Sequence, residues 1–493
     1  MAVNLGKTLD WEQARGDDRA MLEDLQGNIL KGHGRHHTAH LFLNFGSKGD
    51  AEVRPILRSI GRQAQSALDQ LRDAKAFSKS RRSGGRFLSF YLTAAGYDAL
   101  GPAAAAKKPN DAAFLAGMSA RRARLDDPDP STFDDCFQEA DRIHGMLLIA
   151  ADDDDVVKEE AERWETLLSF GGIKVVGREI GFAYLNADGQ GIEHFGYMDG
   201  RSQPLMLTQD VVADAHKDGV PAKPGGGFQW IWDPQFTLDQ ALTPDPGGAL
   251  PGVSCGSYFV FRKLEQDVRR FKDQESETSP GSLADALGLP VPGHPMEDER
   301  ERAGAMVVGR YEDGTPFAAP HVPARGSPPA AKAINNFDFN GDPAGDLCPF
   351  RAHIRKSNPR GDSLRLGATL DEERSHIMAR RGITYGLRDQ DPETKEFRDR
   401  PSGGVGLLFM AHMADIARQF EFTQAAWVNN GGFVDPSAGL DPVIGQGVNG
   451  PGQTDWPDGY GAPNAGQMDF ALCVHLKGGE YFFAPSKSFL TTL

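Results

Sequence analysis

Three short segments carry residue types that could do chemistry together. The first is the run Gly-Tyr-Met-Asp-Gly, which contains Gly196, Asp199 and Gly200. An aspartate between glycines is most often a turn residue, because both residue types accept unusual backbone angles. In the alternative interpretation, the glycines let the backbone approach a flat ligand while Asp199 projects a carboxylate into a pocket.

The second segment, CPFRAHIRKSNPR, spans residues 348–360 and contains one histidine. His353 lies among four cations, namely Arg351, Arg355, Lys356 and Arg360. A histidine in a loop is usually structural or solvated, but a neutral imidazole beside several guanidinium groups suits an anionic metallocofactor. Haem has that shape, because its iron would take the imidazole and its propionates the cations. Cys348 is a competing haem ligand, since a thiolate also binds haem iron.

The third segment, RRGITYG, begins with Arg380 and Arg381. Paired arginines usually lie on a solvated helix end, but one of them could supply a fixed positive charge in a buried site. Near the start, His36 and His40 belong to a histidine cluster that would share a face only on a helix. Because the segment enters a predicted strand, we do not expect a metal there. The sequence contains no P-loop, no G-x-S-x-G and no H-E-x-x-H.

Composition narrows the classes of protein that this chain can be. It has 493 residues and a formal net charge of −16, which argues against nucleic acid or anionic lipid as a partner. No apolar stretch approaches the length needed to span a bilayer, and the start shows no export signal. The 4 cysteines are widely spaced, so a disulfide framework or zinc site is not indicated. A soluble cytoplasmic protein with reduced thiols is expected.

Hydrophobic patterning predicts an α+β protein built from antiparallel sheets with flanking helices. The first half has the order strand, helix, strand, strand, helix, strand, which is the ferredoxin-like pattern; the ranges are 40–45, 52–75, 87–92, 143–150, 154–170 and 175–185. The second half resembles a looser copy, so two ferredoxin-like domains are expected. We divide the chain into a leader at 1–37, mobile over its first 20 residues, an N-terminal domain at 38–210, a Gly/Pro-rich crossover at 211–252 and a C-terminal domain at 253–493.

Taken together, the three segments resemble those of the dye-decolourising peroxidase family, haem peroxidases of the dimeric α+β barrel-like superfamily. GYMDG matches the family's GxxDG motif, CPFRAHIRKSNPR resembles its proximal-histidine segment, and RRGITYG resembles its distal-arginine segment. Weaker similarities occur at 22–35, 257–268 and 415–427, so the resemblance covers most of residues 21–485. The long insertions resemble the larger bacterial and fungal-type branch.

The resemblance implies roles for individual residues. His353 would be the proximal iron ligand, Asp199 the distal carboxylate and Arg380 the distal arginine. Arg381 is the alternative one position further on, and Arg380 is preferred because its distance to Gly386 fits the family's spacing best.

Further residues around the haem are implied in the same way. Arg355 is expected to meet a haem propionate, and Glu421 to accept the proximal imidazole N–H, with Asp415 as its rival. The residues expected to line the site are Gly200, Leu407 and Phe409. Arg201 departs from the family, where an apolar residue is more usual; it would add positive charge near the haem edge or pair with an Asp or Glu.

The implied function is a haem b peroxidase that uses hydrogen peroxide to oxidise dyes, phenols or other aromatic reductants in one-electron steps. Asp199 would move a proton between the peroxide oxygens and Arg380 would stabilise the leaving oxygen, which yields an oxo-ferryl haem. Because an ordinary Asp has a pKa of about 4, an acidic optimum is implied. The acidic surface would attract cationic reductants or Mn²⁺.

Bulky dyes would react at a surface Tyr or Trp; the candidates are Trp230, Trp232, Trp427, Trp456, Tyr385 and Tyr460. The alternative function is a non-catalytic protein that binds haem or releases its iron. The pair of Asp199 and Arg380 favours catalysis, because storage needs no proton shuttle.

Overall fold

The first half of the chain forms a four-stranded antiparallel sheet in ferredoxin-like order. A computed structural model describes residues 2–46, 50–275, 281–287, 301–318, 334–446, 454–459, 462–470 and 472–493. The strands are β1 (His37–Asn44), β2 (Phe87–Leu92), β3 (Gly145–Ala151) and β4 (Lys174–Phe182), and their order in the sheet is β2-β3-β1-β4. Every neighbouring pair is antiparallel, as the sequence pattern predicts.

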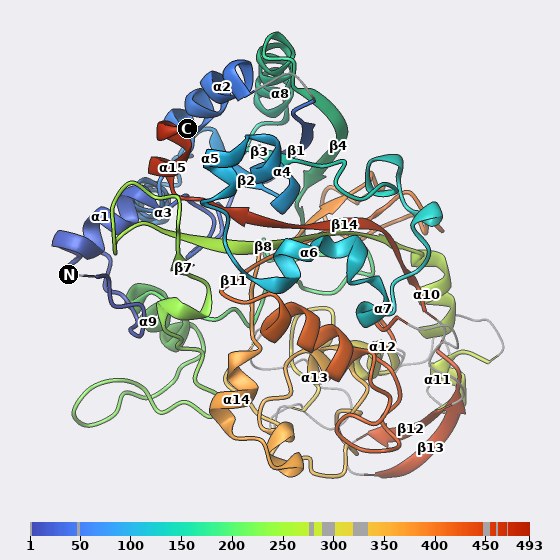
Figure 1. Cartoon of the computed structure of the whole chain (residues 1–493). Coiled ribbons are helices and arrows are strands. Elements are labelled where there is room, and N and C mark those ends of the chain that lie inside the picture. The colour runs from blue at the N-terminus through green and yellow to red at the C-terminus, as the bar shows by residue number, and fades with distance from the viewer. Residues whose placement is uncertain are drawn as a thin grey trace.

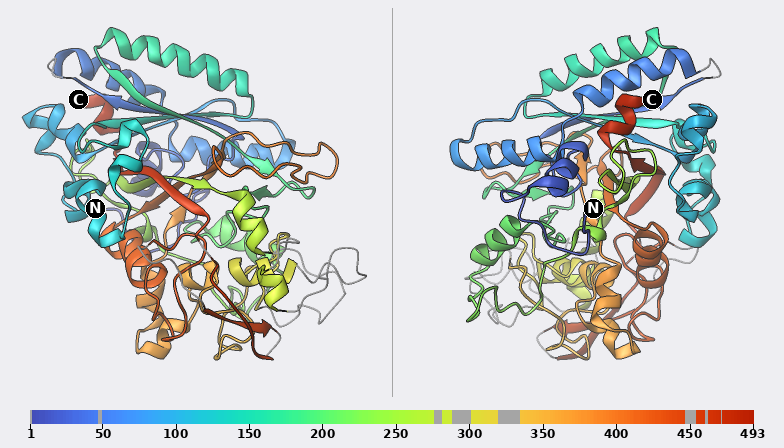
Figure 2. Two further views of the ribbon diagram at one scale, coloured as in Figure 1. Left: turned by 90° about the vertical axis from the view of Figure 1, so that its right-hand side faces the viewer. Right: turned by 60° about the vertical axis from the view of Figure 1, so that its left-hand side comes forward.

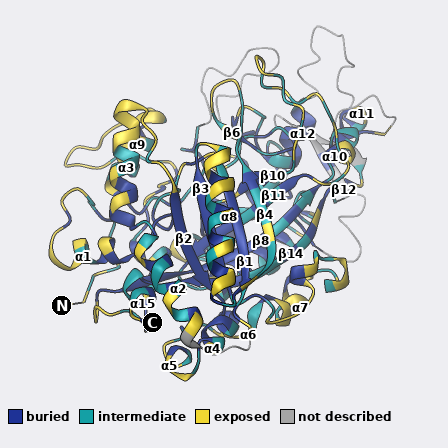
Figure 3. Ribbon diagram, turned by 90° about the horizontal axis from the view of Figure 1, so that it is seen from above, coloured by how far each residue is buried: buried dark blue, intermediate teal, exposed yellow. Residues whose placement is uncertain are grey.

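Helix α8 (Asp154–Phe170) covers this sheet, and its sequence explains why. Asp153 caps the helix by accepting the N–H of Asp155, and acidic residues in the first turn suit the positive end of the helix dipole. Its buried residues, Val157, Ala161, Trp164 and Leu168, recur at helical spacing and lie on one face. Figure 3 shows α8 across the strands, with its exposed residues turned outward.

The helix expected over 52–75 is in fact two helices, α2 (Asp50–Gln63) and α3 (Ala67–Ser80). The chain breaks between them because Gln65 donates its N–H to the carbonyl of Leu88 on β2. Ser66 then caps the second helix by accepting the N–H of Asp69. A tertiary hydrogen bond therefore overrides the continuous helical pattern.

The second half repeats the strand order of the first. Its strands are β8 (Cys255–Gln266), β9 (Ala379–Arg380), β10 (Ile383–Tyr385), β11 (Gly406–Met413) and β14 (Val474–Ala484). The order β10-β11-β8-β14 matches β2-β3-β1-β4 position for position, with β9 also paired to β11. The expected duplication is therefore visible in the topology.

The two sheets join into one curved sheet that closes on itself. On one side β14 pairs with β2 at Phe483 and Leu92. At the other side the hydroxyl of Thr384 on β10 donates to the carbonyl of Phe182 on β4. Gly181 permits this approach, since a Cβ there would lie 2.6 Å from the Ile383 side chain. An aromatic core that includes Phe42, Tyr91, Phe259, Phe261 and Phe482 packs as one buried cluster, and the helices cover a second cluster.

The remaining elements surround this barrel and leave one side rich in loops (Figures 1 and 2). The helices are α1 (Gly16–Asp24), α4 (Ala94–Ala99), α5 (Pro102–Ala105), α6 (Ala112–Ala120), α7 (Arg122–Leu125), α9 (Thr208–Lys217), α10 (Val268–Glu275), α11 (Leu283–Ala286), α12 (Glu301–Val308), α13 (His353–Ser357), α14 (Leu370–Ser375) and α15 (Lys487–Thr492). The short strands are β5 (Tyr184–Leu185), β6 (Gly191–Ile192), β7 (Thr243–Pro244), β12 (Thr454–Gly459) and β13 (Ala462–Met468). Among the described residues, none of these helices has the length and apolar character that crossing a membrane requires.

The expectation of a mobile leader is wrong. Leu9 is buried, and its N–H donates to the carbonyl of Met206 at 2.9 Å. Met21, Leu22 and Leu25 are completely buried in the aromatic core cluster. The charged residues between these apolar positions hide the pattern in the sequence, but the segment packs firmly on the barrel.

Candidate active site

A cavity of about 210 Å³ brings together most of the residues singled out in the sequence. The predicted residues that line it are Asp199, Gly200, Arg201, His353, Arg380, Leu407 and Phe409. Arg355 and Glu421 do not line it. The cavity lies against β8 and β11, whose side chains Leu264, Leu407 and Phe409 make part of an apolar wall.

His353 begins the short helix α13 and is held by a carboxylate from a distant loop. Its Nδ1–H donates to Asp441 Oδ2 at 2.8 Å, across 88 residues of chain. Burial lowers the pKa of His353, but the Asp441 carboxylate outweighs it, so the pKa lies above its ordinary value. Since Nδ1 is engaged by Asp441, Nε2 is the imidazole atom available to a metal.

Asp441, which the sequence analysis missed, is therefore the partner of His353. Asp441 is itself fixed, because its Oδ1 accepts the N–H groups of Val443 and Ile444. The sequence around it carries no periodicity or spacing that links it to His353. Only the path of the loop brings the two together.

The prediction that Glu421 accepts the His353 N–H is wrong, because Asp441 does so. The Glu421 carboxylate accepts two hydrogen bonds from Arg121, at 2.7 and 2.6 Å, and one from the Tyr481 hydroxyl. Its rival Asp415 is also excluded as the partner, since it accepts the backbone N–H of Arg418. Asp415 precedes and Glu421 ends the wide helical turn η6 (Ala417–Glu421), which is followed by η7 (Thr423–Val428). Phe420, Thr423 and Gln424 of these turns line the cavity.

Asp199 lies in a tight turn between two glycines with left-handed backbone angles, a φ of +102° at Gly196 and +79° at Gly200. Its Oδ1 accepts the N–H of Gly200 at 2.6 Å. The same turn fixes the arginine, since Arg380 Nη2 donates to the Arg201 carbonyl at 2.8 Å. Burial lowers the pKa of Arg380 and the nearby Asp199 opposes this shift. The carboxylate and the guanidinium thus share one electrostatic environment.

The side chains of Arg380 and Arg381 point in different directions, because successive residues of a strand face opposite sides. Arg380 is the last residue of β9 and lines the cavity. Arg381 instead donates to the carbonyls of Asn28 and Ile29, each at 2.7 Å. Successive side chains of an extended backbone point to opposite faces, so only one of the two can enter the cavity. The structure places Arg380 there.

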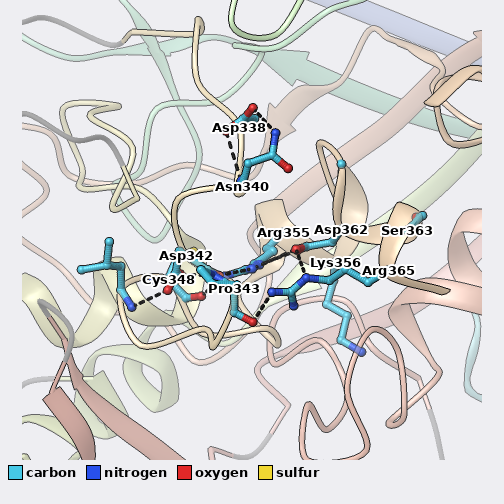
Figure 4. A network of polar contacts seen from close by, with 12 residues as sticks. Asp338, Asn340, Asp342, Pro343, Cys348, Arg355, Lys356, Asp362, Ser363 and Arg365 are labelled. Carbon is cyan, nitrogen blue, oxygen red and sulfur yellow. Dashed lines mark hydrogen bonds and ion pairs between the residues drawn. The ribbon is translucent and has the colours of Figure 1, made fainter. Parts of the chain in front are cut away.

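The prediction that Arg355 meets a haem propionate is also wrong, because two aspartates already neutralise its guanidinium. Its side chain is 1% exposed and donates to Asp362 at 2.6 Å and to Asp342 at 2.7 Å. It also donates to the carbonyl of Cys348. Figure 4 shows Arg355 between the two aspartates. Its role is to hold the loop before α13, and no donor remains for a propionate.

Arg360, from the same segment, and Arg310 provide the positive charge that Arg355 does not. Both line the cavity and are buried. Arg360 donates to the Asn335 and Phe337 carbonyls, the Ser202 hydroxyl and the Asn335 side chain. Arg310 donates to the carbonyls of Gly314 and Ile334 and to Ser202. None of these acceptors carries a charge.

Two buried guanidinium groups, Arg310 and Arg360, with only uncharged acceptors are electrostatically unfavourable unless an anion binds them. Burial, reinforced by nearby Arg201, lowers the pKa of Arg310 to about 9. Burial and then Arg310 itself lower the pKa of Arg360 well below its usual range. Buried charges are normally paired. The residues therefore fit a flat apolar group with carboxylates at one edge and a metal facing His353, as in haem.

Comparison with known proteins identifies the chain. The multifunctional dye peroxidase DyP2 of Amycolatopsis sp. is 43% identical over 502 residues, which cover 100% of both chains. The chain belongs to the DyP-type peroxidase family. The family model described as the DyP dimeric alpha+beta barrel domain matches residues 24–181. The DyP2 structure superposes with a TM-score of 0.86 over 100% of both chains.

Two further DyP-type structures are similar over nearly the whole length. The Anabaena sp. enzyme has a TM-score of 0.84 and 37% identity, and covers 98% of this chain and 97% of its own. A dye-decolorizing peroxidase in complex with 2,6-dimethoxyphenol has a TM-score of 0.74 and 27% identity, and covers 95% and 98% respectively. The chain is therefore a DyP-type peroxidase with the expected fold.

Arg201, the departure from the family pattern, pairs with aspartates, which is the second of the two expected roles. It lines the cavity, and its guanidinium pairs with Asp214 and, at 2.5 Å, with Asp218. The helix α9 that follows the GxxDG turn carries Asp214 on one of its turns. The two carboxylates balance the charge of Arg201, so Arg310 and Arg360 remain the cations of this cavity that have uncharged acceptors.

The candidates for surface oxidation are mostly buried. Trp232, Trp427, Trp456 and Tyr385 are each less than a tenth exposed, whereas Trp230 is half-buried. Tyr460 lies outside the described residues. Burial does not rank these residues as electron donors, and their role stays a prediction.

Proposed function

We propose that this DyP-type peroxidase binds one haem b, with His353 as the axial ligand. The observation that carries this proposal is the His353–Asp441 pair, which faces a cavity where Arg310 and Arg360 are buried beside uncharged acceptors. The imidazole would hold the iron and the two arginines the propionates. Leu264, Leu407 and Phe409 would contact the macrocycle. Bound haem supplies the redox centre that exchanges electrons with peroxide and with reductants.

The chain's own residues would manage the protons and charge of hydrogen peroxide. Asp199 takes the proton from one peroxide oxygen and returns it to the other, directly or through a water. Arg380 stabilises the negative charge that develops on the leaving oxygen. Asp441 holds the His353 imidazole in one orientation and makes it a stronger electron donor.

The reductants proposed are dyes, phenols and other aromatic molecules, oxidised one electron at a time. The names of the relatives as dye peroxidases and the dimethoxyphenol complex support this class. Mn²⁺ remains a prediction from the acidic net charge. In the described part of the chain, no group of three or more His, Cys, Asp or Glu residues has an arrangement that could hold a metal ion.

The absorption spectrum of purified protein reconstituted with haem tests the proposal. We expect a Soret band in the wild type that is lost or altered in His353→Ala and unchanged in Cys348→Ala. Cys348 is completely buried, its pKa is raised to about 12 by burial, and it does not line the cavity. A haem spectrum that survives in His353→Ala but is lost in Cys348→Ala would show thiolate ligation instead.

Adding peroxide separates catalysis from storage. An enzyme changes its spectrum within the stopped-flow time range and returns to the resting spectrum when a dye is added. A spectrum that only bleaches, with release of iron and no oxidised dye, would favour the non-catalytic alternative.

A further inference from the structure

A second cavity, of about 420 Å³, lies beside the proposed haem cavity. Its walls come from the β5–β6 hairpin, α10 and the loop 388–400. Phe195 lines both cavities, and it is 2% exposed and stacked on Phe271 with ring centroids 4.0 Å apart. One fixed aromatic side chain therefore belongs to the wall of each cavity.

The second cavity contains a buried hydrogen-bond acceptor without a partner. His194 lines it and is 0% exposed. Its Nε2 lies 2.8 Å from the Tyr385 carbonyl, which can only accept, so Nε2 carries the proton. Nδ1 is then a bare acceptor, and it has no hydrogen-bond partner. Such an atom is costly to bury unless a donor meets it.

An aromatic surface lies next to this acceptor. The Phe397 ring packs 6.1 Å from the His194 ring and 5.0 Å from the Tyr184 ring, measured between centroids. On Phe397 the Arg388 guanidinium stacks at 3.9 Å. Planar groups at these spacings form a wall against which another aromatic ring can stack.

Two of the cations that line the cavity, Arg388 and Lys272, are each paired with a carboxylate. Arg388 Nε binds Asp399 at 3.0 Å, and its Nη1 donates to the His194 carbonyl. Lys272 binds Glu312 at 2.7 Å. The aromatic wall and the bare Nδ1 of His194 therefore call for a ligand with an aromatic ring and one hydroxyl donor.

We propose that this second cavity binds a small neutral phenol, whose ring packs against Phe397 and whose hydroxyl donates to His194 Nδ1. The proposal rests on the proposed function, because it places a reductant against Phe195 at the wall of the haem cavity. It assigns the phenol a site distinct from the peroxide side, where Asp199 and Arg380 lie.

Binding is measured with the holoenzyme in the absence of peroxide, by fluorine NMR titration of para-fluorophenol. Para-fluoroanisole is the matched probe, since it has the same ring but no hydroxyl. In the wild type we expect the phenol to bind roughly fivefold to tenfold more tightly than the anisole, as one hydrogen bond provides. In His194→Phe a planar ring remains but the acceptor nitrogen is gone, so the two probes should bind equally.

A second variant tests the location without touching His194. Ala187 lies exposed on the hairpin and lines the cavity, so Ala187→Phe should fill it and weaken para-fluorophenol binding at least about tenfold. Ala103→Phe, at an exposed position on α5 away from both cavities, is the control and should bind as the wild type does.

The outcomes separate this proposal from the proposed function. The titration needs no turnover, so a protein that lacked peroxidase activity would still report on the cavity. Equal affinity of the wild type and Ala187→Phe for the phenol would overturn the proposal. A phenol preference that persists in His194→Phe, which has no side-chain acceptor, would overturn the assigned hydrogen bond.

Discussion

Asp441 determines what His353 can do. An imidazole that donates Nδ1–H to a carboxylate is oriented and more basic at Nε2 than one hydrogen-bonded to a neutral group. Here the donor–acceptor distance is 2.8 Å and the carboxylate is completely buried. Solvent therefore screens this carboxylate less than it would an exposed one, and its charge acts more strongly on the imidazole.

Replacing this carboxylate changes the electronic character of the proximal side. Asp441→Asn keeps an oxygen that accepts the N–H but removes the charge. We expect the reduction potential of bound haem to rise and the rate of reaction with peroxide to fall about tenfold to a hundredfold. Spectroelectrochemical titration measures the potential. Glu421→Gln is the matched control and should leave the potential unchanged, because Glu421 pairs with Arg121 instead.

Asp199 is the second residue whose role can be isolated. Asp199→Ala removes the acidic side chain that the GxxDG turn presents to the cavity, so the proton of peroxide loses its proposed acceptor. The rate of the peroxide reaction should fall about 10²-fold to 10⁴-fold, while haem content stays the same. Stopped-flow absorbance measures the rate and the pyridine haemochrome assay the content. An unchanged rate would assign the proton transfer to another group.

At the scale of elements, the short strand β9 decides which arginine serves the site. Its residues pair with β11, at Ala379 with His412 and at Arg380 with Ala411, and this register fixes the direction of each side chain. The duplicated sheet thus has a functional consequence, because β11 holds β9 while it also presents Leu407 and Phe409 to the cavity.

Two neighbouring substitutions should therefore have different effects. Arg380→Leu should slow the peroxide reaction by about 10²-fold or more without a large loss of stability. Arg381→Leu should keep the peroxide rate but lower the free energy of unfolding by about 2–4 kcal/mol, because two charged donors leave the Asn28 and Ile29 carbonyls. Urea denaturation and stopped-flow measurements on both variants decide this. If Arg381→Leu lost the peroxide reaction and Arg380→Leu kept it, the assignment would be reversed.

For the whole molecule, buried carboxyl groups link stability to pH. Glu480 on β14 accepts the N–H groups of Met118 and Tyr481. Burial, opposed by these hydrogen bonds, raises the pKa of Glu480 from 4.5 to about 7. Between pH 4.5 and about pH 7, Glu480 keeps its proton in the folded protein but releases it in the unfolded chain. The contribution of Glu480 to the free energy of unfolding is greatest below about pH 4.5. It is lost as the pH rises through about 7.

Glu480→Gln should remove this pH dependence. A glutamine still accepts both N–H groups but does not titrate, so the variant should gain about 1–3 kcal/mol on the wild type between about pH 4.5 and about pH 7. Buried histidines such as His40, whose pKa burial lowers to about 4, act in the opposite direction. The free energies of unfolding of the wild type and Glu480→Gln are therefore compared at each pH by urea denaturation. A difference that does not change with pH would contradict the raised pKa of Glu480.

Much of this protein follows from local sequence. The strand at 87–92 and the helix at 154–170 agree with β2 and α8 residue for residue, because each is set by its own periodicity and caps. The motifs also brought Asp199, His353 and Arg380 into one hypothesis, and the structure places all three at one cavity. Chemistry that depends on residue type and short spacing is readable in the chain itself.

Tertiary structure decided which charges meet. His353 pairs with Asp441, 88 residues away, and Arg355 pairs with Asp342 and Asp362, which leaves Arg360 and Arg310 to face the cavity. Packing also turned the charged leader into part of the core at Leu9 and Met21. An ion pair depends on distance in space and on side-chain direction, and a linear sequence carries neither until the loops have folded around the barrel.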